Sequence, residues 1–161
     1  MKKLVAWIDK TLKFLLAVAM SSILLAVIWQ VISRYLMDDP ASFTEEFARF
    51  LLIWIGILGA ALAYRERAHL GFNLLVERAG SYQKILLTII EVIVFLFCLL
   101  VLVNGGALLV NLTLELEQIS ASLGVKIGYV YSVLPLSGLL IMFYCVVNIH
   151  NLWQPDEARK W

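Results

Sequence analysis

Glu91 is the acidic residue that lies furthest inside an apolar stretch of this 161-residue chain. It follows Lys84 by seven residues, so an α-helix would carry its carboxylate roughly 10 Å beyond that lysine. A carboxylate inside a membrane span can relay a proton or an ion, contact a neighbouring helix, or be tolerated in its protonated form. Because the sequence places no second carboxylate at a similar depth, we favour a structural contact over a complete ion path.

Glu45, Glu46 and Arg49 form a second group of charged residues beside an apolar run. Their spacings of three and four residues bring both carboxylates within reach of the guanidinium on one helix face. The same stripe continues with small residues that permit close helix approach in lipid, namely Gly56, Gly59, Ala60 and Ala63. This pattern predicts a face that packs on protein, although the carboxylates would also suit a helix N-terminus in the headgroup region. Arg34 ends the preceding apolar run and would either pair with Glu45 or Glu46 or extend to lipid phosphate.

The remaining reactive residues indicate no catalytic chemistry. Cys98 and Cys145 lie inside apolar runs without the C-x-x-C spacing of redox or metal sites. His69 and His150 are not placed as the facing pair that a haem would need at mid-membrane depth. The sequence has no glycine-rich phosphate loop and no metal-ligand motif. We therefore predict no cofactor and no enzymatic activity.

The elements that hold these residues are mostly apolar. The chain is 62% hydrophobic and 16% charged, against roughly 45–50% and 25% in soluble domains. A soluble fold of this length could not bury so much apolar surface, so lipid must surround most of the chain. The net charge of +1 argues against nucleic acid as a partner. The sequence shows no repeat or linker, and we predict a single integral-membrane domain over residues 1–161.

Four runs without charged residues divide the chain, at 14–33, 50–64, 92–114 and 127–155. Roughly 20 helical residues cross a hydrocarbon core of about 30 Å. Three runs are long enough alone, and the second must extend back through Thr44 to cross. We predict an all-α membrane protein with four transmembrane helices, at about 12–36, 43–64, 84–112 and 128–152, and a short interfacial segment between the second and third. Pro135 is expected to kink the fourth helix.

The basic residues are distributed unevenly over the two sides of these helices. With the N-terminus inside, only Arg34, Arg49 and Lys126 lie outside, and every other Lys and Arg is cytoplasmic. This asymmetry follows the positive-inside rule and places both termini in the cytoplasm. The outer side is net acidic, and its loops carry Asp38, Asp39, Glu115 and Glu117.

Several different short motifs occur one after another along the chain. They are Gln30-Val31-x-x-Arg34-Tyr35, Thr44-Glu45-Glu46 with Arg49, Leu58-Gly59-Ala60, and Ser120-Ala121-x-Leu123-Gly124. Together they resemble the small membrane subunit of tripartite ATP-independent periplasmic (TRAP) transporters, over residues 25–140. The length and the four-helix layout agree with that family. Phe43 stands where tryptophan is expected, and it serves similarly at a headgroup boundary.

The resemblance implies a subunit of the bacterial inner membrane that works with partners. It implies a much larger membrane subunit that holds the substrate and sodium sites. It also implies a periplasmic binding protein that delivers an organic-acid anion, such as a dicarboxylate or a sialic acid. The candidate contacts with the large subunit are then Arg34, Glu45, Glu46, Arg49, Gly56, Gly59, Ala60, Ala63 and Glu91. The candidate docking residues for the binding protein are Asp38, Asp39, Glu115 and Glu117.

A different class of function is a small self-sufficient exporter that acts as a homodimer and couples transport to protons through Glu91. Small multidrug carriers also have four helices, but they are shorter and carry their essential carboxylate in the first helix. The first apolar run of this chain, 14–33, contains no carboxylate. This absence counts against the exporter, which remains the alternative to the transporter subunit.

Overall fold

A computed structural model describes residues 2–36, 42–66 and 83–153. Its elements are α1 (Lys2–Leu36), α2 (Ser42–Arg65), α4 (Gln83–Phe97), the π-helix η2 (Cys98–Gly105), α5 (Gly106–Glu115), α6 (Ile127–Tyr131) and α7 (Val133–Leu152). They form four helices long and apolar enough to span a membrane, Lys3–Tyr35, Ser42–Arg65, Gln83–Glu115 and Ile127–Leu152. The predicted all-α fold with four transmembrane helices is confirmed. The predicted interfacial segment, with His69, lies outside the described residues.

The first helix begins at Lys2, well before its predicted start at about residue 12. The added turns are amphipathic. Val5 is buried against Tyr144 of α7, Leu12 is buried against Leu58 of α2, and lysines occupy the exposed face. Lysines interrupt the apolar sequence here, so a search for uncharged runs could not detect this part of the helix.

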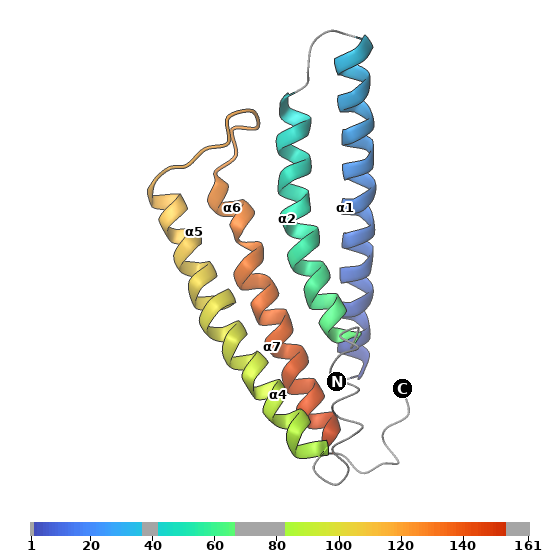
Figure 1. Cartoon of the computed structure of the whole chain (residues 1–161), viewed down its shortest axis with the longest axis vertical. Helices are drawn as coiled ribbons and strands as arrows, with labels where there is room; N and C mark the ends of the chain where they lie inside the picture. The colour runs from blue at the N-terminus through green and yellow to red at the C-terminus, as the bar shows by residue number, and fades with distance from the viewer. Residues whose placement is uncertain (1, 37–41, 67–82, 154–161) are drawn as a thin grey trace.

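The four spans form one layer, in the order α1, α2, α6–α7 and the third span (Figure 1). α1 packs mainly on α2, α2 also packs on α7, and α7 packs on α4 and η2. The fourth span is therefore central, and 44% of its apolar window is buried, against 6% in the first and third spans. The start of α1 and the end of α7 lie at the same end of the molecule, as four crossings require (Figure 1).

Glycines allow the third and fourth spans to approach closely. A Cβ added at Gly138 would lie 2.8 Å from Leu102 Cβ, and one added at Gly106 would lie 2.9 Å from Leu134 Cβ. A Cβ added at Gly128 would lie 2.6 Å from Leu114 Cγ of the facing helix. Close backbone approach is a main source of helix–helix attraction in lipid, because it maximises dispersion contacts.

The π-helix η2 keeps one side of the third span in contact with α7. Its hydrogen bonds reach one residue further than those of an α-helix, so each residue turns the chain by a smaller angle. Cys98 and Gly106 are both buried toward α7, whereas an unbroken α-helix would point them about 80° apart. The fourth span is interrupted between α6 and α7 at Ser132, three residues before Pro135, which has no N–H to donate to the preceding turn. The kink or local widening expected at Pro135 stays a prediction.

Substitution of Gly138 by alanine tests the close approach. In Gly138→Ala the new methyl group overlaps Leu102, and we expect the free energy of unfolding to fall by about 1–3 kcal/mol. Thermal denaturation of the detergent-solubilised chain, followed by tryptophan fluorescence, measures the effect. Gly56→Ala is the matched control, because a Cβ there meets nothing within 4 Å. Equal midpoints for the two variants would contradict the close packing.

Candidate functional site

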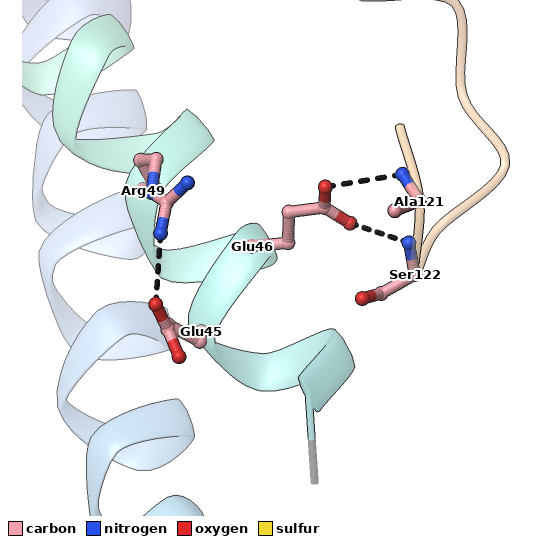
Figure 2. A network of polar contacts seen from close by, with 5 residues as sticks. All are labelled: Glu45, Glu46, Arg49, Ala121 and Ser122. Atoms are coloured by element: carbon pink, nitrogen blue, oxygen red, sulfur yellow. Dashed lines mark hydrogen bonds and ion pairs between the residues drawn. The ribbon is translucent and has the colours of Figure 1, made fainter. Parts of the chain in front are cut away.

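Glu46 joins α2 to the loop between the third and fourth spans (Figure 2). Its Oε2 accepts hydrogen bonds from Ser120 Oγ at 2.6 Å and from the Ser122 N–H at 2.8 Å. The Leu123 N–H also donates to Oε2 at 3.2 Å, and the Ala121 N–H donates to Oε1 at 3.2 Å. Four donors therefore converge on one carboxylate, and hydrogen bonds to an ionised group are stronger than neutral ones.

The loop folds so that its N–H groups face Glu46. The Ser120 N–H donates to the Val125 carbonyl at 2.9 Å, and the Gly124 N–H donates to the Ser120 carbonyl at 3.1 Å. Gly124 has a φ of +65°, which glycine adopts without steric cost. The two motifs that contain Glu46 and Ser120 are distant in sequence, and here they form one anion-binding turn.

Glu45, the neighbour of Glu46, makes a different contact. Its Oε1 pairs with Arg49 Nη2 at 2.8 Å, and both side chains are more than half exposed. Sequence reasoning expected Glu46 near the same guanidinium, but Figure 2 shows it directed to the loop. Among the described residues, Arg34 forms no ion pair with either glutamate and lies exposed near the end of α1.

Glu91 is held between two neighbouring helices. Tyr64 Oη of α2 donates to its Oε2, and Asn148 Nδ2 of α7 donates to its Oε1 at 3.0 Å. Tyr64 Oη also lies 3.2 Å from Cys145 Sγ. The favoured reading of Glu91 as a structural contact agrees with this geometry, in which three spans meet at one carboxylate. Asn148, a buried amide in an apolar run, was the overlooked sequence signal for its partner.

A second polar cluster lies where α1, α2 and α7 meet at the predicted cytoplasmic end. Tyr144 Oη donates to Asp9 Oδ1 at 2.8 Å, and Arg65 Nε lies 3.3 Å from Asp9 Oδ2. The Lys13 ammonium pairs with Glu66 at 2.6 Å beside a cavity of about 200 Å³. Sequence reasoning missed this cluster because Asp9 lies among lysines and resembles part of a solvated basic segment.

The small residues of α2 lie on a surface that the described part of the chain leaves open. We call Gly56, Gly59, Ala60 and Ala63 the small-residue face. Gly56 and Ala60 are exposed, and Gly59 and Ala63 are half-buried. A Cβ added at Gly56 or Gly59 would meet no atom within 4 Å. The described residues therefore leave open space beside these glycines.

The acidic docking candidates are only partly described. Glu115 ends α5, and Glu117 lies in the turn that follows; both are exposed. Asp38 and Asp39 lie outside the described residues. Among the described residues, no group of three His, Cys, Asp or Glu residues could hold a metal ion.

Residues 23–154 match the family of tripartite ATP-independent periplasmic transporters, DctQ component. The chain belongs to this family. A putative TRAP transporter small permease protein of Haemophilus influenzae is 28% identical over 149 residues, or 92% of this chain and 91% of the relative. The sialic acid TRAP transporter small permease protein SiaQ of Vibrio cholerae is 27% identical over 157 residues, with coverage of 93% and 86%.

A longer relative is the sialic acid TRAP transporter permease protein SiaT of Haemophilus influenzae. It is 27% identical over 146 residues, which make up 88% of this chain and 21% of the relative. These comparisons confirm the resemblance of this DctQ-family chain to the small membrane subunit. They also agree with a multi-pass membrane protein that acts in transport.

The contact between Glu46 and the loop can be tested by comparing a substitution of Glu46 with the same substitution of its neighbour Glu45. In Glu46→Gln one oxygen becomes an NH₂ group, which faces donors instead of accepting from them. Loss of charge-assisted bonds of this kind costs about 1.5–3 kcal/mol each. We expect backbone amides 121–123 to exchange hydrogen at least about tenfold faster, measured by mass spectrometry. Glu45→Gln loses only an exposed i,i+4 pair of about 0.3–0.5 kcal/mol and should leave this exchange unchanged.

The contact at Glu91 can be tested by substitution, with Thr88, one helical turn away, as the control position. Glu91→Ala removes the acceptor of both Tyr64 and Asn148, so we expect the denaturation midpoint of the detergent-solubilised chain to fall by several degrees. Thr88→Ala removes only a bond from Thr88 Oγ1 to the Lys84 carbonyl of the same helix and should change the midpoint little. An unchanged midpoint in Glu91→Ala would contradict a structural role for the carboxylate.

Proposed function

We propose that this small TRAP subunit binds a large permease subunit and supports it in the membrane, with no transport pathway of its own. The observation that carries the proposal is the small-residue face, which is open beside α2. Small residues let a helix of another protein approach closely in lipid. SiaT, in which the matched region is 21% of a permease protein, supports direct contact with a large partner.

The charged residues beside this face extend the proposed contact. Glu45, Arg49 and Arg34 are exposed toward the end of the molecule that holds the Glu46 loop, so they can pair with charges of the permease. Glu46 and Glu91 are candidates of a second kind. Their carboxylates bind within the chain, and they would support the interface by fixing the helices that form it.

We further propose that the transporter takes up an organic-acid anion of the dicarboxylate or sialic acid type, delivered by a periplasmic binding protein. The names of SiaQ and SiaT support the sialic acid class. The substrate and sodium sites are assigned to the large subunit.

The docking surface for the binding protein is proposed at Glu115 and Glu117, together with Asp38 and Asp39. Glu117 has a φ of +47°, which costs a non-glycine residue free energy. A glycine would relieve that cost, so the presence of a carboxylate there favours a functional use.

The orientation of the chain follows from the same assignment. We propose that both termini face the cytoplasm of a bacterial inner membrane, because lysines and arginines gather at the end that holds Lys3, Lys10, Lys13 and Arg65. The Glu46 loop then faces the periplasm, where the binding protein is located.

The alternative of a self-sufficient exporter requires Glu91 to be available for protons or substrate. Both oxygens of Glu91 accept hydrogen bonds from neighbouring helices, which favours the structural role. The exporter would be supported if Glu91→Gln abolished transport while assembly with the permease stayed intact.

Copurification with a co-expressed large TRAP permease subunit of the same organism tests the proposed function. We expect the wild-type chain to recover the permease, and Gly56→Leu with Ala60→Leu to reduce recovery by about tenfold or more, since bulk blocks close approach. Ala17→Leu, which makes the same change as Ala60→Leu at an exposed position of α1, is the control.

Reconstitution provides the second arm of this test. Proteoliposomes that contain both membrane subunits and the binding protein should take up the anion. Uptake by this chain alone would overturn the proposed function.

A further inference from the structure

Two asparagine side chains of the third span are exposed. Asn104 lies near the middle of the uncharged run 92–114, and Asn111 follows it by seven residues. In the described part of the chain, neither amide takes part in a side-chain hydrogen bond. Both amides therefore face the surroundings of the protein, Asn104 near the middle of the uncharged run and Asn111 four residues before Glu115.

The two amides share one face of the helix. Residues four and seven positions apart lie on the same side of an α-helix, so Asn104, Leu108 and Asn111 form one stripe. Leu108 is 71% exposed. The opposite side carries Gly106 and Thr113, which are buried. We call Asn104, Leu108 and Asn111 the amide face, and it points away from α7.

The position of the amide face in the fold excludes a partner from this layer. The third span forms one edge of the row of helices and packs mainly on α6 and α7 (Figure 1). Its contact with α2 is made through Glu91, thirteen residues before Asn104. The opposite edge is formed by α1. Whatever covers the amide face must therefore come from outside the described helices.

A lipid chain cannot satisfy such a surface. Transfer of an amide into hydrocarbon without a hydrogen-bond partner is unfavourable, and Asn104 is too short and too deep to extend to the headgroups. Asparagine side chains in spans typically hydrogen-bond to a side chain of another helix. The seven-residue spacing suits a helix that crosses at a small angle, because contacts then recur every seven residues.

We propose that the amide face binds a transmembrane helix of the large permease subunit, which presents polar side chains to Asn104 and Asn111. This inference rests on the proposed function and assigns it a second contact surface, separate from the small-residue face of α2. The permease is favoured over a second copy of this chain because SiaT joins one matched region to a much longer permease chain. One permease for each small subunit can cover the edge without self-association.

Site-specific photo-crosslinking tests this placement in the assembled complex. A benzoylphenylalanine is introduced at Leu108, between the two amides, and the complex is irradiated in membranes that contain the co-expressed large subunit. We expect an adduct that mass spectrometry identifies as the large permease subunit. An adduct with a second copy of this chain, or with lipid alone, would overturn the proposal.

Asparagine replacements provide an independent measurement. Because the amides make no side-chain hydrogen bond within the described chain, Asn104→Leu and Asn111→Leu should leave the denaturation midpoint of the isolated chain unchanged. We expect each to reduce permease recovery by about three- to tenfold, as loss of one interhelical hydrogen bond predicts. Val18→Leu, at an exposed apolar position of α1 on the opposite edge of the layer, is the control and should recover the permease fully.

The outcomes separate this proposal from the proposed function. If the wild-type chain recovers the permease but the double variant Asn104→Leu with Asn111→Leu recovers it equally, the amide face is wrong and the subunit assignment stands. If the wild-type chain recovers no permease, both are overturned.

Discussion

The arrangement of this protein depends on polar contacts between apolar helices. Lipid tails are as apolar as leucine, so burial of leucine against leucine gives little hydrophobic stabilisation within a membrane. The α1–α2 hairpin is joined to the other two spans by Glu46 at one end, by Trp54 Nε1 donating to the Val130 carbonyl at 3.0 Å, and by Tyr64 donating to Glu91 nearer the other end. These contacts lie at three levels and therefore fix both the distance and the rotation of the hairpins.

The sequence predicted the spans well because one physical quantity decides them, namely the length of chain without charge. It predicted Glu91 as a structural contact for a related reason, since an isolated carboxylate in lipid needs donors. It could not predict that Glu46 binds the loop at Ser120 instead of pairing with Arg49. Local spacing favours the nearby guanidinium, whereas four converging donors arise only once the distant loop is folded. The amphipathic start of α1 and the π-helix were missed because each departs from the uniform uncharged α-helix.

The single-layer arrangement has a consequence for assembly. In a closed bundle each helix buries one side in a shared core, but a row leaves two broad faces and two edges uncovered. Only the fourth span is substantially buried here. Lipid covers leucine and valine on the remaining surface without cost. Lipid chains offer no hydrogen-bond partner to the amides of Asn104 and Asn111. They also gain little packing energy in the open space beside Gly56.

These exposed features are compatible with a stable small subunit because the polar contacts of Glu46 and Glu91 form within the chain itself. A partner that meets a fixed surface loses less affinity to ordering of side chains and helices. Glu46 and Glu91 can therefore matter for assembly without touching the permease, since each holds one part of the layer in place. A helix that packs on the small-residue face of α2 and another that covers the amide face of η2 and α5 would meet the layer at separate positions. Such a two-point attachment resists rotation of the permease about either contact, which is the property that a fixed support requires.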